Sequence, residues 1–387
     1  SPATSMRMKQ SVLFYAILLM QCFLTCFGNQ QLLAQPEEHD VPTVMAGKAD
    51  VDGPHIFYRK NKIYTKKVVQ KDTGAVAVID SIEAKRRADI VVECQFAKTP
   101  QWNFSTRLKP KLRNENTEYP KVEKLIAISD IEGNFEAFRR FLLSQKVIDD
   151  KYNWIFGKGH LVCVGDFFDR GANVTECLWL IYDLEEKAKA AGGYVHFILG
   201  NHEIMNMSND YRYVSPKYMR NADLFQEPYG NWFKSSTELG RWLGTKNVVE
   251  KIGDMIFVHG GLAPDLNRLD KSLIDINNAM RPFYFIQDDV FRLGDEELQF
   301  LFDANGPLWN RSYVMANIPE SDVEESLRKF GGKRIIVGHT LVNHAKMLYG
   351  GKVIAIDTRH VDPNSTALLF DGGKLYRIDQ TGKRTEM

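Results

Sequence analysis

HLVCVGDFFDRG, residues 160–171, shows most directly how this chain folds. An apolar run of strand length ends in Asp166, which follows Gly165. A short turn that contains Asp169 comes next and ends at Gly171. Similar apolar runs occur at residues 124–130, 194–201, 254–261, 333–340 and 352–358. Stretches with helical spacing, such as 135–145 and 175–191, separate several of them. Continuous apolar strands that alternate with helices predict an α/β fold with sheet faces covered on both sides.

Polar residues stand where these predicted strands end. They are Asp130, Asp166, Asn201, His259 and His339. The spacing is 36 residues from Asp130 to Asp166 and 35 from Asp166 to Asn201, which suits one strand–helix–strand crossover each time. Because ligands of α/β sheets bind outside the carboxyl ends of the strands, we expect these side chains to meet. Asp, Asn and His without a thiolate predict a metal site with oxygen and nitrogen ligands.

Two neighbouring residues add what a phosphate site requires. Arg170 follows Asp169 in the turn after Asp166, and its planar guanidinium can bind two phosphoryl oxygens at once. His202 comes one residue after Asn201 and is available for proton transfer. The combination indicates a metal-dependent reaction at a phosphate group.

Five motifs occur in a fixed order along the chain: ISDIEGN, GDFFDRG, GNHE, VHGG and GHT. In this order they resemble the calcineurin-like metallophosphoesterases, and specifically the PPP-type phosphatases. The segments at 200–214 and 306–311 are similar to the Shewanella-like protein phosphatase branch. The resemblance covers about residues 122–358. It implies an αββα sandwich of two mixed sheets with a di-metal centre, in place of one parallel sheet.

The resemblance also implies a set of metal ligands. Asp130 and Asp166 would bind the first metal, and Asp166 would bridge to the second. Asn201, His259 and His339 would complete the second metal. Two divalent cations of this kind lower the pKa of water and neutralise charge on a phosphoryl group.

The same resemblance assigns the catalytic and substrate-binding residues. His202 matches a general acid that protonates the leaving oxygen, and Asp169 would orient it. Arg170 would hold phosphate oxygens, and Arg311 matches a second phosphate-binding arginine. Asn201 is expected beside the substrate as well as at the metal.

Glu132 departs from the family pattern, which is Asp-x-His-Gly in the first motif. Here Asp130 is followed by Ile131, Glu132 and Gly133, so a carboxylate stands where the family has a histidine ligand. We weigh a substitute carboxylate ligand first, a ligand position filled by water second, and an inactive binding module third. With Glu132 bound, the first metal has three carboxylates, which favours Mn²⁺ or Mg²⁺ over Zn²⁺, with Fe as a further candidate.

The predicted function is hydrolysis of phosphomonoesters by a metal-activated water. The leading substrate is a phosphoprotein, of either the serine/threonine or the tyrosine type. The alternatives are an exported small-molecule or nucleotide phosphatase, a phosphodiesterase, and a non-catalytic binding module.

The N-terminus predicts export. Arg7 and Lys9 precede a strongly apolar stretch, so residues 1–34 read as a signal peptide or a membrane anchor. The expected location is the periplasm or the outer side of a membrane, with a possible membrane tether through this segment. Residues 35–119 form a β-rich N-terminal region in this prediction, and residues 120–387 the phosphoesterase domain, with 204–250 as a candidate lid.

Composition limits the partners. The chain has 387 residues, 50 Lys and Arg against 49 Asp and Glu, and a formal net charge of +1. This balance, without a block of like charges, argues against nucleic acid as a partner. Only Cys94, Cys163 and Cys177 remain beyond residue 34, which is no disulfide framework, and Cys163 lies inside an apolar strand.

Several residues near the motifs have other interpretations. His196 lies within a predicted strand and is expected in the core, whereas His39, His55 and His360 are expected at the surface. Glu203 is interpreted either as support for a ligand histidine or as a structural carboxylate, and Asp357 as a hydrogen-bonding structural residue. In the candidate lid, the residues to test for substrate contact are Tyr211, Arg212 and Tyr213.

Overall fold

The computed structural model describes residues 48–315 and 318–387. The predictions for residues 1–34 and for His39 lie outside the described residues. Across the described ranges, no helix combines the length and the apolar character that crossing a membrane requires.

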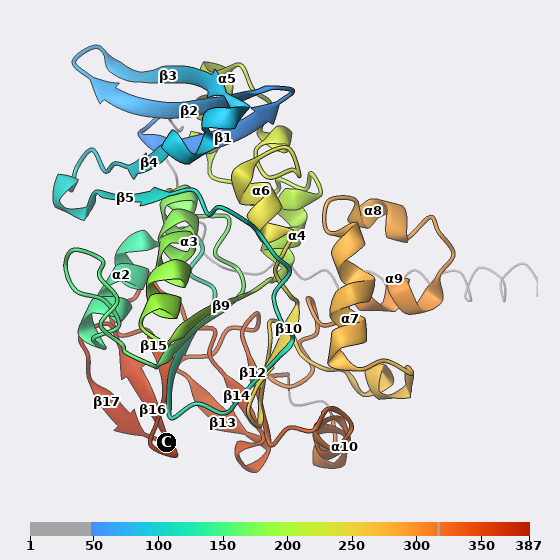
Figure 1. Cartoon of the computed structure of the whole chain (residues 1–387). Coiled ribbons are helices and arrows are strands. Elements are labelled where there is room, and N and C mark those ends of the chain that lie inside the picture. Colours follow the sequence, from blue (N-terminus) through green and yellow to red (C-terminus); the bar gives the residue numbers. More distant parts are fainter. Residues whose placement is uncertain (1–47, 316–317) are drawn as a thin grey trace, which may run out of the picture. The chain divides into compact units, whose positions relative to one another are not determined.

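Two six-stranded mixed sheets form the body of the fold (Figure 1). The first has the order β17-β16-β15-β7-β8-β9, in which β7, β8 and β9 run parallel and β15 to β17 run antiparallel. Its strands are β7 (Lys124–Ile128), β8 (His160–Val164), β9 (Tyr194–Ile198), β15 (Thr366–Asp371), β16 (Lys374–Asp379) and β17 (Arg384–Glu386).

The second sheet has the order β13-β14-β12-β11-β10-β6. Parallel pairs join β11 to β12 and β12 to β14, and β10 pairs antiparallel with β11. Its strands are β6 (Glu118–Tyr119), β10 (Val249–Ile252), β11 (Met255–Val258), β12 (Arg334–Val337), β13 (Lys346–Leu348) and β14 (Val353–Ala355). The prediction of two mixed sheets is therefore confirmed.

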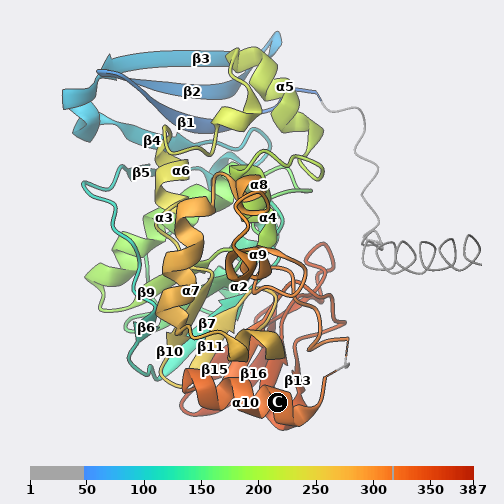
Figure 2. The ribbon, with the colours of Figure 1, turned by 90° about the vertical axis from the view of Figure 1, so that its right-hand side faces the viewer.

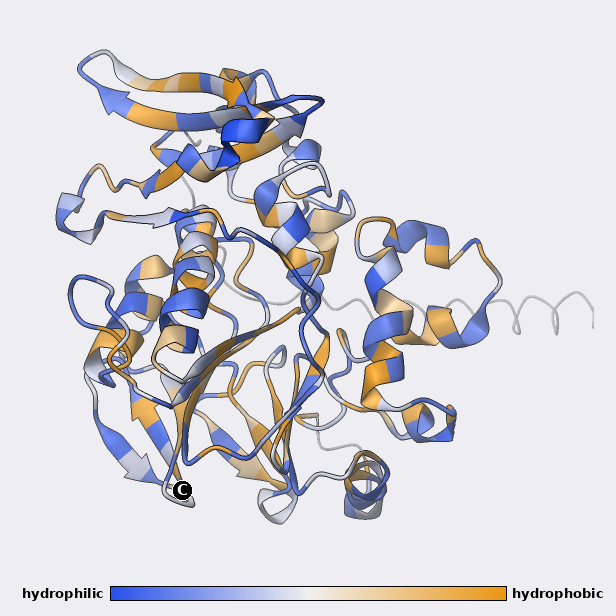
Figure 3. Cartoon of the chain, in the orientation of Figure 1, coloured by the Kyte–Doolittle hydropathy of each residue, from blue (hydrophilic) through white to orange (hydrophobic). Residues whose placement is uncertain are grey.

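Central strands such as β8 are almost entirely apolar because they contribute to two cores. In β8, Val162 and Val164 belong to the cluster that also holds Phe257 and Ile336 of the second sheet. Leu161 and the other alternate residues belong to the larger cluster, which includes the helices. A strand alternates its side chains between two faces, so both faces here must be apolar. Figure 3 shows hydrophobic residues along these central strands.

Helices and loops cover the outer sides of the sheets (Figures 1 and 2). The described α-helices are α2 (Phe135–Ser144), α3 (Val174–Ala190), α4 (Asn201–Met207), α5 (Pro216–Phe225), α6 (Glu238–Leu243), α7 (Leu273–Met280), α8 (Gln287–Val290), α9 (Glu296–Phe302) and α10 (Glu320–Phe330). The Asn134 side chain caps the start of α2 by accepting from the backbone N–H of Ala137. The helices predicted at 135–145 and 175–191 are confirmed as α2 and α3.

The N-terminal part of the described chain is rich in strands, as predicted. The antiparallel sheet β1-β2-β3 and the pair β4-β5 comprise β1 (Asp52–Arg59), β2 (Lys62–Lys71), β3 (Gly74–Glu83), β4 (Val91–Cys94) and β5 (Phe104–Arg107). In Figure 2 the β1-β2-β3 sheet lies beside α5, which contacts β2 and β3. The boundaries at 34, 119 and 204–250 stay predictions.

Two histidines predicted at the surface are buried, and those predictions are wrong. His55 is 1% exposed because its Nε2 pairs with Asp52 at 2.8 Å and its ring packs against Trp232. His360 is 6% exposed because its ring nitrogens contact the carbonyl of Ser129 and the hydroxyl of Ser365. His196, predicted in the core, is buried in β9.

Candidate active site

Sharp turns follow the strands that carry the predicted ligands. Asp130, Asp166 and His339 each lie two residues after a strand and have φ angles of 53°, 57° and 66°. These left-handed conformations are unfavourable for residues with side chains, so the surrounding structure must hold them in place. Such strain is common at functional sites, and here it occurs at four of the predicted ligands, since Glu132 has a φ angle of 48°.

Three of the predicted ligands meet in one buried group. The ligand atoms of Asp166, His259 and His339 all lie within 4.8 Å of one another. His259 Nδ1 contacts the carbonyl oxygen of Val164 at 2.7 Å, so this nitrogen donates and Nε2 is left for a ligand. Nε2 lies 2.9 Å from Oδ2 of Asp166, so a proton or a cation can lie between these two atoms.

Asn201 and Asp130 complete the surroundings of this group. The Asn201 side-chain oxygen is buried and has no hydrogen-bond partner in the described chain. Oδ2 of Asp130 accepts from the backbone N–H of His339 at 3.1 Å. Buried acceptors that lack a donor are rare and require an explanation. Amide, carboxylate and imidazole atoms converging in this way fit a divalent cation.

Position 200 requires glycine because the Asp166 side chain lies close to the backbone of this residue. A Cβ on Gly200 would lie 2.2 Å from Oδ1 of Asp166. Any larger residue would therefore displace the carboxylate.

The charges of the group act strongly on its histidines. Burial alone lowers the pKa of His259, but the carboxylates of Asp166 and Asp130 outweigh it and raise the pKa to about 10. Burial raises the pKa of Asp130 to about 6, whereas the pKa of Asp166 is held low by His259 and His202 against the effect of burial. The carboxylates thus favour positive charge between them, here the proton on His259, and a bound cation would supply the same kind of charge.

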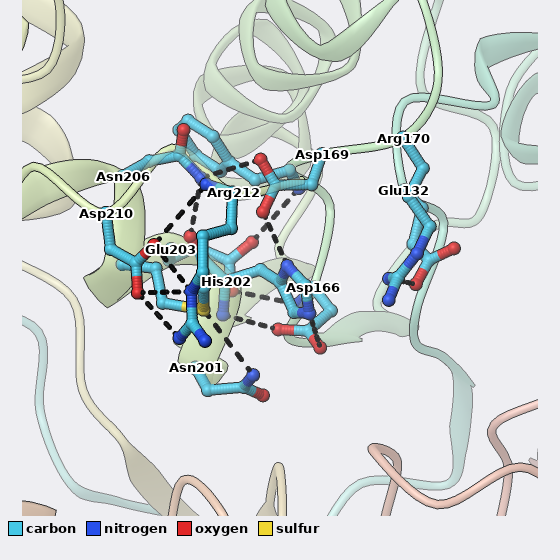
Figure 4. A network of polar contacts seen from close by, with 12 residues as sticks. Glu132, Asp166, Asp169, Arg170, Asn201, His202, Glu203, Asn206, Asp210 and Arg212 are labelled. Carbon is cyan, nitrogen blue, oxygen red and sulfur yellow. Dashed lines mark hydrogen bonds and ion pairs between the residues drawn. The ribbon is translucent and has the colours of Figure 1, made fainter. Parts of the chain in front are cut away.

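His202 lies beside the ligand group and is paired with Asp169, as Figure 4 shows. Its Nδ1 is 2.5 Å from Oδ2 of Asp169, and its Nε2 is 3.9 Å from Oδ2 of Asp166. Burial lowers the pKa of His202, but Asp166 and Asp169 raise it to about 9. The arrangement presents a protonated ring held by one carboxylate.

Glu203 supports the backbone rather than a ligand histidine. Its carboxylate accepts from the backbone N–H groups of Asp166, Phe167 and Gly200 at 2.8, 2.7 and 2.7 Å. It therefore joins the turn after β8 to the start of α4, and so fixes Asp166 relative to Asn201.

The predicted phosphate-binding arginines flank the group. The Arg170 guanidinium contacts the carboxylate of Glu132 and lies 5.0 Å from the ring centre of Tyr213. Arg311 donates from Nη1 to the carbonyl oxygen of His339 at 2.7 Å. Figure 4 places Glu132 and Arg170 side by side, apart from the pair of His202 and Asp169. The roles of Glu132 and of both arginines stay predictions.

Of the candidate lid residues, Tyr213 lies nearest the site in the described contacts. Its ring centre is 5.3 Å from that of His202, and 36% of the residue is exposed. Arg212 forms an exposed pair with Asp210, and Tyr211 packs on Tyr229.

Sequence reasoning missed two residues at the site, Asn206 and Tyr229. Asn206 donates to Oδ1 of Asp169 at 2.9 Å and accepts from the hydroxyl of Tyr229 at 2.6 Å. Asn206 lies one helical turn after His202, which was the available signal. Asp357, expected in a structural role, is buried, and besides burial the charges of Asp130 and Glu132 raise its pKa well above the usual value.

Known proteins share these features. Residues 123–343 match the family described as calcineurin-like phosphoesterase. A Shewanella-like protein phosphatase 2 from Arabidopsis thaliana is 27% identical over 280 residues, which are 60% of this chain and 70% of that protein. A Shewanella-like protein phosphatase 1 from Plasmodium berghei is 30% identical over 258 residues, covering 61% and 68% of the two chains.

A solved structure is similar over nearly its full length. The cold-active protein-tyrosine phosphatase of a psychrophilic Shewanella species superposes with a TM-score of 0.78 and 31% identity, covering 87% of this chain and 99% of the other. The family match, the shared architecture and the site geometry agree. This chain therefore belongs to the calcineurin-like phosphoesterases, a family of metal-dependent phosphoester hydrolases.

Proposed function

We propose that this chain is a phosphoprotein phosphatase that hydrolyses phosphomonoesters at the site of Asp166, His259 and His339. The observation that carries this proposal is the convergence of the buried ligand atoms of Asp166, His259 and His339 within 4.8 Å of one another, together with the buried Asn201 Oδ1, which has no hydrogen-bond partner in the described chain. His202, which is paired with Asp169, lies beside Asp166, and Arg170 contacts Glu132. A cation, a proton donor and an anion-binding group are the parts that phosphoryl transfer requires.

Two divalent cations are proposed at the site. Asp130, Glu132 and Asp166 are proposed for the first, and Asp166 with Asn201, His259 and His339 for the second. When bound, the cations lower the pKa of water and neutralise the charge of the phosphoryl group. Oxygen and imidazole ligands without a thiolate favour Mn²⁺, with Mg²⁺ and Fe as alternatives.

The chain's own residues handle the phosphate and the proton. In this proposal Arg170 and Arg311 bind the phosphoryl oxygens and orient the ester. His202 donates the proton on Nε2 to the leaving oxygen, because Asp169 holds Nδ1. Asn206 fixes Asp169 in turn through its side-chain amide.

The leading substrate is a phosphorylated protein. The named relatives are protein phosphatases, and the similar solved structure is a protein-tyrosine phosphatase. Tyr213 supports an aromatic substrate side chain in particular, because its half-exposed ring stands beside His202, where the leaving group must lie.

A substrate panel tests the proposal. The full chain is purified, loaded with Mn²⁺, Mg²⁺, Fe²⁺ or Zn²⁺ in turn, and assayed on phosphotyrosine, phosphoserine and phosphothreonine peptides, on nucleotides and on sugar phosphates. Preference for a phosphopeptide, with dependence on an added divalent cation, is expected. Preference for a nucleotide or a sugar phosphate would support the small-molecule alternative, and turnover of bis-p-nitrophenyl phosphate but not of the monoester would indicate a phosphodiesterase.

Export is proposed on the apolar segment of residues 1–34. Cell fractionation combined with mass spectrometry of the N-terminal peptide tests it. A mature N-terminus near residue 35 outside the cytoplasm indicates a signal peptide, and an intact N-terminus in the membrane fraction indicates an anchor. Cytoplasmic protein with an intact N-terminus contradicts both.

A further inference from the structure

One side-chain contact joins Glu132, in the first family motif, to Arg170, in the turn after β8. Nη1 of Arg170 contacts Oε1 of Glu132, and the two side chains are 12% and 24% exposed. The backbone holds them side by side, because the N–H of Gly171 donates to the carbonyl of Glu132 at 2.9 Å. Glu132 thus directs its carboxylate at the arginine that is proposed to bind phosphate.

A carboxylate and a phosphoryl group present the same kind of surface to an arginine. Both offer two oxygens that accept from the guanidinium fork, and both carry negative charge. A guanidinium donor that is bonded to Glu132 is not available to a phosphoryl oxygen. Charge-assisted bonds of this kind contribute more than neutral ones, so displacing Glu132 weakens phosphate binding.

We propose that Glu132 is an internal competitor for Arg170, which the substrate phosphate must displace before it can bind. This inference rests on the proposed function, since it assigns Arg170 to the phosphate. It gives the replacement of the family's histidine by Glu132 a consequence for substrate affinity, separate from any effect on the metals.

The test measures binding of inorganic phosphate to the full-length, Mn²⁺-loaded protein by titration calorimetry, with metal content determined on the same samples. Glu132→Gln keeps the shape of the side chain and removes its charge. We expect phosphate to bind about tenfold more tightly to this variant. Glu136→Gln is the matched control, because Glu136 also pairs with an arginine, four residues along the chain, but on an exposed helix face. Its phosphate affinity is expected to equal that of the wild type.

A double-mutant cycle assigns the effect to the contact. In an Arg170→Ala background phosphate binds more weakly, and Glu132→Gln is expected to produce no further gain. An unchanged or weaker phosphate affinity for Glu132→Gln alone would overturn the inference, whether or not the variant also loses the metal equivalent that Glu132 is proposed to hold. A gain that persists without Arg170 would also overturn it.

The outcomes separate this inference from the proposed function. If the protein hydrolyses no phosphoester but Glu132→Gln still tightens phosphate binding, only the proposed function fails. If the protein is an active phosphatase whose phosphate affinity does not respond to Glu132→Gln, only the inference fails.

Discussion

Two buried polar clusters lie along the same strands. The site cluster follows the ends of β8 and β9 and contains Asp166 and His202. The edge cluster includes His160 at the start of β8, His196 within β9 and Glu250 of β10, so it joins the two sheets at one edge. Both contain histidines and carboxylates away from water. They differ in how completely their members are paired.

The edge cluster is internally satisfied. His160 Nδ1 lies 2.8 Å from His196 Nε2, and His196 Nδ1 lies 2.6 Å from Glu250, whose other oxygen accepts from Asn247 at 3.0 Å. Lys246 is paired with Glu115 and Glu185. The site cluster leaves Asn201 Oδ1 without a hydrogen bond among the described residues. Complete pairing is typical of a structural network, and incomplete pairing of a site that binds something.

The largest expected effect contrasts one histidine from each cluster. His202 and His196 are both buried and both contact a carboxylate, but the pKa of His202 is raised to about 9 against the effect of burial, and burial lowers that of His196 to about 3. We expect His202→Ala to lower kcat by roughly 10²–10⁴-fold with unchanged metal content. The matched variant His196→Ala should lower the melting temperature and leave the kcat of folded protein unchanged. Equal losses of kcat in the two variants would contradict the assignment of a catalytic role to one cluster and a structural role to the other.

The next effect concerns stability alone. Lys246→Met leaves Glu115 and Glu185 without their shared cation, and Lys246 and Glu185 are 1% and 3% exposed. Removing one member of a buried ion pair typically costs about 3–5 kcal/mol of unfolding free energy. Urea unfolding measures this cost. The exposed pair of Lys374 and Glu386 provides the control, since Lys374→Met should leave the unfolding midpoint unchanged. A midpoint equal to that of the wild type for Lys246→Met would contradict a structural role.

His360 tests whether a histidine's hydrogen bonds or its place in the fold decide whether it serves stability or catalysis. It is buried next to the site, but both of its ring nitrogens are hydrogen-bonded. Burial lowers its pKa to about 4 from a usual value near 6.5, so between these values the unfolded chain binds the additional proton. The stabilisation is therefore complete above about pH 6.5 and is lost as the pH falls towards 4, by roughly 3 kcal/mol. His360→Gln should flatten the pH dependence of unfolding free energy in this window. An unaltered slope would show that His360 is not its source.

The smallest expected effect tests the support of the site. Glu203→Gln replaces an oxygen that accepts from backbone N–H groups with an amide donor, so the turn carrying Asp166 loosens. Loss of such supporting contacts typically lowers metal affinity by about 10–100-fold. Competition with a metal chelator measures this change. A loss of stability with no change in metal affinity would show that Glu203 has a structural role, like the residues of the edge cluster.

The strands and their endings were predictable because they follow repeated rules. Apolar runs indicated the strands, and polar residues after them indicated where side chains would meet, as the group of Asp166, His259 and His339 confirms. The pairing of strands that are far apart in the sequence was not predictable from these rules. The two-residue strand β6 joins β10 from about 130 residues away, and such a short segment has no periodicity to detect.

Residues outside the motifs were harder to interpret. His55 and His360 belong to none of the motifs in the sequence, and their burial depends on their tertiary partners. Asn206 and Tyr229 support Asp169 through uncharged groups, which are common in any helix or loop. The contact of Glu132 with Arg170 depends on how two separate turns lie together, and no spacing along the chain encodes it.

The three buried thiols in the described part of the chain have a practical consequence for following the protein's motions. Cys94 lies in β4, Cys163 in β8 and Cys177 in α3, and all are free and buried, with burial raising the pKa of each thiol well above its usual value. A thiol reagent can reach them only when the structure around them opens, and its rate then reports the free energy of that opening. Peptide mapping would separate the three rates, giving one probe of local unfolding in the N-terminal strands, one in the first sheet and one in the helix that covers it.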